Sequence, residues 1–508
     1  MSGCISHVFH VEHDSPIDGT VAHVVEHLIH VMQAAFGDRG VNLASNSKGQ
    51  SFCEVEARAD DRASESDAAQ HRIEDVYWEI SVAFATGAPQ PGIANAITDS
   101  DILDTQRGWG SNRGEYESAG DSLGQTSDDR LASVSDPQNL SAHSSLDPYD
   151  AVLLLSYGGP NKPEDVLPFL RDVVSGKNIP DERLVEVGAH YSLFDGRSPI
   201  NGENLRLIRD LGAALHARGV QVPILFGNRH WNPYTVDTLR SAIAYGAKRI
   251  LVIITAAYVS YSGSRQYREH LAETVTALEA ETGVRLEVDI LRAFYNDPSF
   301  VEANVNAVRE AAKQLADGPV HIAYVTHSIP KTMNVASGAT GPTYLEQHQL
   351  VAELVDEALH AELGNRISGS SLSFCSRSGS PHQPWLEPDI NDRLDQVHAE
   401  GVSNVVIAPI GFISDHMEVA FDLDTEALAH ARELGLNARR SATAGSRAEF
   451  VDGLASLVID RAARERGEAS DRPVVGEQPV APDVAPPNSA RQRDGVVTGV
   501  PVVAGDED

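Results

Sequence analysis

The chain has 508 residues, a hydrophobic fraction of 42 % and a formal net charge of −33. This length and composition are typical of a soluble protein with a large buried core. So acidic a chain excludes nucleic acid and anionic lipid as main partners, because both require a basic binding surface. The N-terminus lacks the apolar run of a signal peptide, and no segment approaches the ~18 apolar residues of a membrane helix. We therefore expect a cytoplasmic protein without a transmembrane segment.

Residues 1–146 predict an acidic, disordered extension. They contain 8 Lys+Arg and 23 Asp+Glu, and residues 99–145 are rich in Ser, Asp and Gly with few apolar side chains. Such a composition buries too little apolar surface to offset the entropy of ordering the chain. Within the extension, residues 21–36 show helical spacing, and residues 73–84 have the pattern of either a helix or a strand.

The pattern changes at residue 149, where strands and helices begin to alternate. Residues 151–156 are a short apolar run, typical of a strand buried on both faces of a parallel sheet. The next helix has one apolar face, formed by Val166, Phe169, Leu170 and Val173. Further predicted elements are strands at 222–226 and 249–254 and helices at 235–245 and 264–281. This alternation predicts βαβ units and a parallel sheet.

The same pattern then restarts. Strands are predicted at 320–325, 371–374 and 404–408, with a helix between the first two whose apolar face includes Val351, Val355 and Leu359. We therefore predict an α/β fold of two similar Rossmann-like lobes, with parallel sheets that face a central cleft. The lobes are expected at 147–312 and 313–466. The tail, 467–508, is rich in Pro, Val and acidic residues and is predicted to be disordered.

Two groups of polar residues follow predicted strands, where α/β proteins place their ligands. His327 lies just after the strand predicted at 320–325 and has the chemistry of a metal ligand or a general base. Glu418, Asp422 and Glu426 are spaced i, i+4, i+8, so an α-helix would place them on one face as oxygen ligands for a divalent cation. The alternatives are a hydrogen-bonded loop histidine and a solvated acidic helix face.

Six short segments together resemble the ferrochelatase family over roughly residues 147–466. They are LLSYGGP (154–160), GRSPING (196–202), GNRHW (227–231), THSIP (326–330), SRSG (376–379) with PWLEP (384–388), and SDHMEV (414–419). Their order and spacing are those of the family, and the second and third segments are most similar to its Gram-positive, actinobacterial branch. That branch is understood to use coproporphyrin III rather than protoporphyrin IX.

The resemblance implies an activity and a set of site residues. The activity is insertion of Fe²⁺, a substrate, into coproporphyrin III to give Fe-coproporphyrin III in haem b biosynthesis. His327 and Glu418 correspond to the pair that faces the iron, and Asp422 and Glu426 to an outer site for the divalent ion. The porphyrin-contacting positions are Ser198, Tyr267 and Tyr157.

The resemblance also leaves alternatives and one departure. Many relatives carry a [2Fe–2S] cluster on cysteines near the C-terminus, but no cysteine follows Cys375 here, so we expect no iron–sulfur cluster. Neighbouring haem-pathway enzymes are possible partners besides porphyrin and ferrous iron. The alternative functions are a ferrochelatase acting on protoporphyrin IX, a related cobalt chelatase for another tetrapyrrole, and a two-lobed binding protein without turnover.

Overall fold

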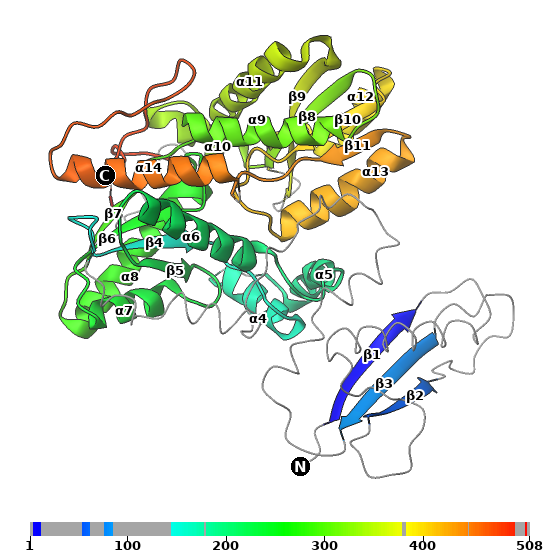
Figure 1. Ribbon diagram of the computed structural model, residues 1–508, viewed down its shortest axis with the longest axis horizontal. Helices are drawn as coiled ribbons and strands as arrows, with labels where there is room; N and C mark the ends of the chain where they lie inside the picture. Colours follow the sequence, from blue (N-terminus) through cyan, green and yellow to red (C-terminus); the bar gives the residue numbers. More distant parts are fainter. Residues whose placement is uncertain are drawn as a thin grey trace, which may run out of the picture. The chain divides into compact units, whose positions relative to one another are not determined.

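A computed structural model describes residues 144–176, 179–377, 383–445, 447–492 and 503–504, together with three strands nearer the N-terminus (Figure 1). The chain divides into two compact units, Met1–Thr126 and Ser127–Asp508. Across the described residues, no helix combines the length and the apolar character needed to span a membrane.

The first unit contains a three-stranded antiparallel sheet. Its strands are β1 (Cys4–Val11), β2 (Cys53–Asp60) and β3 (Val76–Phe84), in the order β1-β3-β2. The predicted disorder of residues 1–146 therefore does not hold for these three segments. Strand β3, which is rich in β-branched and aromatic residues, decides between the two alternatives for residues 73–84. The helix expected at 21–36 lies outside the described residues.

The first lobe of the second unit is built on a four-stranded parallel sheet. Its strands are β4 (Ala151–Ser156), β5 (Ile224–Asn228), β6 (Arg249–Ile254) and β7 (Glu287–Ile290), in the order β5-β4-β6-β7. Its helices are α4 (Pro163–Val173), α5 (Asp181–Ser192), α6 (Ile200–Ala217), α7 (Thr235–Ala244) and α8 (Gln266–Thr282). A π-helical turn, η2 (Tyr261–Arg265), leads into α8.

The second lobe repeats this architecture. Its parallel strands are β8 (Val320–His327), β9 (Ile367–Cys375), β10 (Asn404–Ala408) and β11 (Asn437–Arg440), in the order β11-β10-β8-β9. Its helices include α9 (Pro298–Lys313), α10 (Lys331–Ser337), α11 (Tyr344–Leu363), α12 (Ile390–Ala399), α13 (Leu428–Glu433) and α14 (Ala448–Glu465). Short turns are η3 (Gly338–Thr340) and η4 (Gly364–Arg366), and a longer π-helix is η5 (Val419–Ala427). The predicted fold of two similar α/β lobes is confirmed.

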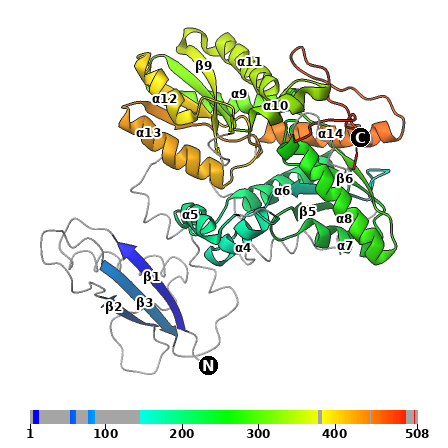
Figure 2. The same ribbon diagram turned by 180° about the vertical axis from the view of Figure 1, so that it is seen from behind.

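The border between the lobes differs from the one predicted at residue 312. Helix α9 packs against α11 and α14 and contacts β10 and β11, so it belongs with the second sheet (Figures 1 and 2). Helical periodicity identifies the apolar face of α9, but it does not identify the sheet on which that face packs. Helix α14 contacts both α9 and α6 and thereby joins the lobes.

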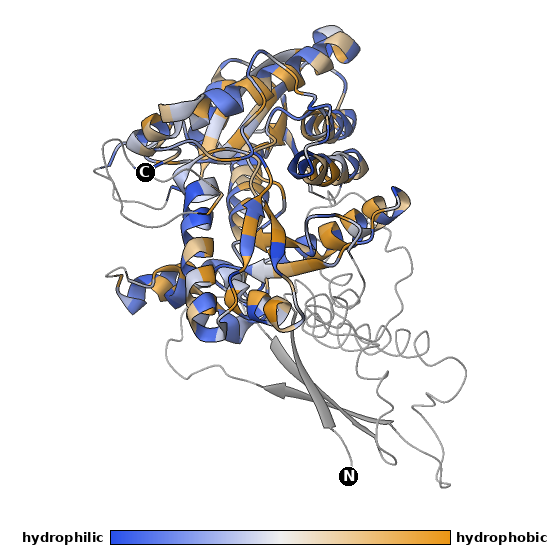
Figure 3. Cartoon of the chain, turned by 90° about the vertical axis from the view of Figure 1, so that its left-hand side faces the viewer, coloured by the Kyte–Doolittle hydropathy of each residue, from blue (hydrophilic) through white to orange (hydrophobic). Residues whose placement is uncertain are grey.

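The core of the second unit is continuous between the lobes. One cluster of buried side chains contains Leu154 and Leu251 from the first sheet together with Ile322 and Val406 from the second. The residues of β4 and β10 are all buried, as expected for strands covered on both faces. In Figure 3 the helices carry alternating hydrophobic and hydrophilic stripes, the pattern of helices with one face in the core.

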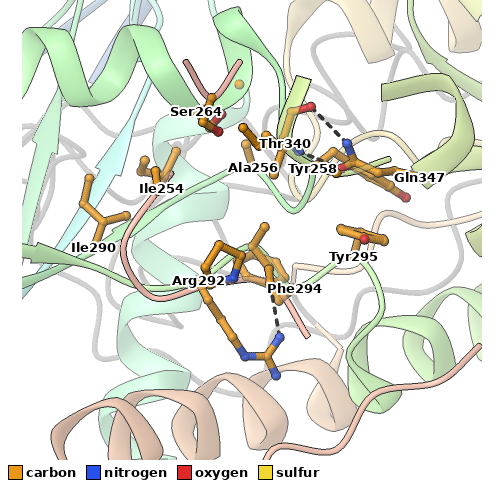
Figure 4. A pocket seen from close by; sticks show the side chains of 18 of the residues that line it. Ile254, Ala256, Tyr258, Ser264, Ile290, Arg292, Phe294, Tyr295, Thr340 and Gln347 are labelled. Atoms are coloured by element: carbon orange, nitrogen blue, oxygen red, sulfur yellow. Dashed lines mark hydrogen bonds between the residues drawn. The ribbon is translucent and has the colours of Figure 1, made fainter. Parts of the chain in front are cut away.

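The first part of the C-terminal tail is packed, which differs from the disorder predicted for 467–508. The backbone N–H of Val475 donates to the carbonyl of Asn296 at 2.9 Å, and the Asn296 amide donates to the carbonyls of Gln478 and Pro479, each at 3.2 Å. The tail also lines a cavity of about 150 Å³ with Tyr258 and Phe294 (Figure 4). A Pro-rich segment resembles a disordered one in composition, but here a folded body supplies donors for its carbonyls.

Two buried histidines should make the fold sensitive to acid. Burial lowers the pKa of His348 to about 3 and that of His321 to about 4, from an ordinary value of 6.5. Between pH 6.5 and about 4 only the unfolded chain takes up these protons. Each histidine should therefore lower the free energy of unfolding by up to about 1.4 kcal/mol per pH unit as the pH falls. Denaturant unfolding across this range measures the slope. His321→Gln should make it shallower, and an unchanged slope would contradict the assignment.

Candidate active site

The predicted site residues lie at the carboxyl ends of the parallel strands. His327 is the last residue of β8, and Tyr157 directly follows β4. Glu418 follows the loop after β10 and immediately precedes η5. These strand ends come from both sheets. Glu418 of the second lobe lies close enough to Tyr157 of the first that its charge, together with burial, raises the pKa of the Tyr157 phenol. The fold therefore brings residues of both lobes into one site.

His327 and Glu418 form the centre of the site. His327 Nε2 lies 3.5 Å from Glu418 Oε1, and the two side chains are 31 % and 45 % exposed. His327 Nδ1 is hydrogen-bonded to the backbone carbonyl of Ser328. A carbonyl only accepts hydrogen bonds, so Nδ1 carries a proton and Nε2 is the nitrogen that exchanges one on the side of Glu418.

The two side chains shift each other's pKa in opposite directions. Burial alone would lower the pKa of His327, but the carboxylate of Glu418 outweighs burial, and the pKa is raised above its ordinary value. Burial alone would raise the pKa of Glu418, but the charge of His327 and its hydrogen bond lower the pKa to about 2. The pair thus favours a protonated imidazole beside an ionised carboxylate.

Glu418, Asp422 and Glu426, here called the acidic row, lie along a π-helix rather than an α-helix, with Glu418 just before its first residue. Asp422 and Glu426 both lie in η5, whose turns contain more residues than those of an α-helix, so side chains four residues apart are not aligned as closely as predicted. Burial, with the charges of Glu418 and Glu426, raises the pKa of Asp422 to about 7. Asp422 is also hydrogen-bonded to the hydroxyl of Ser376. Glu426 is exposed, so the row extends from the site to the surface.

The other side of the same segment is anchored on the first lobe. Met417 belongs to an apolar cluster with Phe169 and Leu184 of α4 and α5, and Phe421 packs against it. The rings of Phe421 and His190 are stacked at 4.0 Å. Across the described residues, no group of three or more His, Cys, Asp or Glu side chains converges as a ready-made metal cluster.

The three predicted porphyrin-contacting residues lie in the first lobe, Tyr157 and Ser198 in loops and Tyr267 in the first turn of α8. The guanidinium of Arg229 is 4.7 Å from the ring centre of Tyr267 and 6.0 Å from that of Tyr157. The backbone N–H of Ser198 donates to the carbonyl of Pro160, three residues after Tyr157. Tyr157 is 37 % exposed, whereas Ser198 and Tyr267 are buried. Tyr157 is therefore the most accessible of the three.

Sequence reasoning missed several neighbours of these residues. His416 Nδ1 lies 3.9 Å from Glu418 Oε2 and accepts the backbone N–H of Glu418 at 3.2 Å. The ring of His230 is 4.7 Å from that of Tyr157, and its Nδ1 is 2.9 Å from an oxygen of Asp172. The segments 227–231 and 414–419 contained these residues, and their location after strands β5 and β10 was the available signal.

The two lobes, with a histidine–carboxylate pair at the strand ends, match a known family of metal-inserting enzymes. The sequence model of the ferrochelatase family matches residues 149–462. The chain belongs to the ferrochelatase family.

Several relatives are similar over nearly their whole length. A coproporphyrin III ferrochelatase from Streptomyces griseus subsp. griseus is 48 % identical over 347 residues, which cover 67 % of this chain and 92 % of the relative. One from Streptomyces coelicolor is 50 % identical over 331 residues, 63 % of this chain and 88 % of the relative. A ferrochelatase from Rhodopirellula baltica is 41 % identical over 346 residues, 68 % and 93 % of the two chains.

Proposed function

We propose that this ferrochelatase inserts ferrous iron into coproporphyrin III and releases Fe-coproporphyrin III. The observation that carries the proposal is the His327–Glu418 pair, 3.5 Å apart at the strand ends of a chain in the ferrochelatase family. The choice of porphyrin is supported by relatives named coproporphyrin III ferrochelatase at 48 % and 50 % identity. A cytoplasmic location and contacts with neighbouring haem-pathway enzymes stay predictions.

The chemistry requires a base and a route for the metal. A free porphyrin loses two pyrrole protons as Fe²⁺ enters, and Nε2 of His327 is placed to accept one of them when it is unprotonated. A divalent cation next to Glu418 would compete with the His327 proton for the same carboxylate, so the arriving iron would lower the pKa of His327 and help to free it as a base. Tyr157, Ser198 and Tyr267 are proposed to contact the macrocycle from the first lobe.

The acidic row supplies the proposed route. A path from Glu426 through Asp422 to Glu418 is supported by the exposure of Glu426, the partial burial of Asp422 and the position of Glu418 beside His327. Carboxylate oxygens are the hard ligands that suit a divalent cation and exchange readily. Asp422 and Glu426 are therefore proposed to hold the ion on its way to Glu418.

A comparison of substrates tests the proposal. Purified enzyme is given ferrous iron under anaerobic conditions with coproporphyrin III or protoporphyrin IX, and porphyrin loss is followed by absorbance. We expect kcat/KM to be at least about tenfold higher for coproporphyrin III, a difference of about 1.4 kcal/mol in transition-state stabilisation. A preference for protoporphyrin IX would contradict the substrate assignment. Faster insertion of Co²⁺ than of Fe²⁺ would support the cobalt chelatase alternative instead.

The purified protein is expected to contain no iron–sulfur cluster. The chain has 3 cysteines, and a cluster usually needs about four thiolates. Cys375 is buried, and burial raises the pKa of its thiol well above the ordinary value, which disfavours the thiolate. Anaerobic preparations should show neither visible cluster absorption nor acid-labile sulfide. Stoichiometric iron and sulfide would overturn the expectation.

Residues before Ser144 should be dispensable for catalysis. The family match begins at residue 149, and the first compact unit ends at Thr126. The cut must leave the next residues in place, because the N–H of Ser145 donates to the carbonyl of Gln221 at 2.8 Å and Leu146 is buried in the core. A chain that begins at Ser144 should keep the kcat and the melting temperature of the full chain. A truncated chain that folds but is inactive would contradict this.

A further inference from the structure

His348 lies behind the His327–Glu418 pair and has no part in the chemistry above. It belongs to α11 and is completely buried. Its ring is stacked on that of Tyr258 from the first lobe, with centres 3.6 Å apart and an interplanar angle of 15°. Figure 4 shows Tyr258 beside Gln347, the preceding residue of α11. The imidazole therefore lies where the two lobes meet.

A chain of hydrogen bonds connects His348 to the backbone of His327. His348 Nε2 lies 2.9 Å from Thr326 Oγ1, and Thr326 Oγ1 lies 2.7 Å from the Tyr344 hydroxyl. The Tyr344 hydroxyl also donates to the carbonyl of His327 at 3.1 Å. Thr326 is held in place by Gly411, where any side chain would overlap it. The catalytic strand end is thus fixed from behind by three buried side chains.

The directions of these hydrogen bonds can be assigned. His348 Nδ1 lies 2.7 Å from the carbonyl of Tyr344, so Nδ1 carries a proton. Burial lowers the pKa of His348 to about 3, which keeps the ring neutral and leaves Nε2 as an acceptor. Thr326 therefore donates its proton to Nε2. The single hydroxyl proton of Tyr344 is then shared between Thr326 Oγ1 and the carbonyl of His327.

We propose that His348 is a positioning residue, which acts through Thr326 and Tyr344 to hold the backbone of His327 so that Nε2 faces Glu418. The inference rests on the proposed role of His327. An apolar residue at position 348 would fill the same space without the cost of burying an imidazole. Only an acceptor at the position of Nε2 keeps the Thr326 hydroxyl oriented. A small rotation of the strand end would move Nε2 of His327 away from the carboxylate.

Four substitutions test the positioning role by separating the two hydrogen bonds of His348. An Asn amide reaches the position of Nδ1 but not that of Nε2. His348→Asn therefore keeps the hydrogen bond to the Tyr344 carbonyl and loses the hydrogen bond from the Thr326 hydroxyl. His348→Gln keeps an acceptor for Thr326. Thr326→Val removes the hydroxyl at constant shape, and Thr326→Ser restores it.

The expected signature is a change in kcat without a change in KM. His348→Asn and Thr326→Val should lower kcat at least about tenfold, because small misplacements of a reacting group are costly. Their KM values for porphyrin and iron should stay within about twofold of the wild type, since neither residue touches a substrate. His348→Gln and Thr326→Ser should retain about a third or more of the wild-type kcat.

His321→Gln is the matched control. His321 is a buried histidine on β8, the strand that also holds Thr326 and His327. Its Nε2 lies 2.9 Å from Ser371 Oγ, which is away from the carbonyl of His327. It should change stability but not kcat. Equal losses of kcat in His321→Gln and His348→Asn, or unchanged kcat in Thr326→Val, would overturn the inference. If His348→Asn does not fold, the comparison of kcat in Thr326→Val and Thr326→Ser tests the inference instead. An inactive wild type would refute the proposed function instead.

Discussion

His327→Ala should reduce iron insertion by about 10²–10⁴-fold, the usual cost of removing an acid–base group. In the wild type, Nδ1 is tied to the Ser328 carbonyl, and Nε2 faces Glu418 at 3.5 Å. Alanine removes the imidazole that is proposed to accept the pyrrole proton. The fold should persist, because the side chain is 31 % exposed and fills no cavity in the core. Steady-state assays with circular dichroism as a check on folding measure both effects.

His360→Ala provides the control for this substitution. His360 is an exposed histidine on α11 of the same lobe, and its Nδ1 lies 2.8 Å from the Asp356 carbonyl of its own helix. It should retain wild-type kcat. Retention of more than about a tenth of the activity in folded His327→Ala would show that another group takes the proton.

The second large effect is expected at Glu418 and not at the other two carboxylates of the row. Glu418→Gln should depress kcat strongly, because it removes the carboxylate nearest the base, on which the arriving ion is proposed to sit before it enters the ring. Asp422→Asn and Glu426→Gln should mainly raise the KM for iron, since they remove an outer site that binds the ion before it reaches the ring. Metal titrations on the three single variants measure the difference.

The pH dependence of the iron KM sharpens this test. The pKa of Asp422 is raised to about 7, so its carboxyl is ionised above pH 7 and becomes protonated below it. In the wild type the KM for iron should therefore rise as the pH falls through 7, and Asp422→Asn should flatten that part of the profile. Glu433→Gln, a change at an exposed carboxylate on α13, should leave the profile as it is. Equal losses of kcat at all three positions, with unchanged KM, would mean that the row is not a graded path.

The strands and the residues that follow them could be predicted from the sequence. Strands β4, β6 and β10 have the bounds expected from their apolar runs, and β8 ends at His327. Short apolar runs are informative here because strands of a parallel sheet are buried on both faces, so almost every residue contributes to the signal. The carboxyl ends of such strands then locate the site.

Other features depend on contacts that no local pattern contains. The C-terminal tail is held by Asn296, which is 182 residues from Gln478. The π-helix η5 departs from the α-helical spacing assumed for Glu418, Asp422 and Glu426. In the same segment, Phe421 packs against the first lobe, a contact that lies outside the local sequence. The sequence shows His348 only as a polar residue on a helix, and its link to His327 depends on hydrogen bonds between α11 and the end of β8.

The most direct test of the proposed function is anaerobic incubation of the full chain with coproporphyrin III and excess ferrous iron, with the product followed by absorbance and mass. We expect many turnovers per enzyme, one iron in each porphyrin, and a rate of conversion that is about 10²–10⁴-fold lower with His327→Ala. Tight porphyrin binding without iron insertion, or conversion that His327→Ala leaves unchanged, would contradict the proposed function.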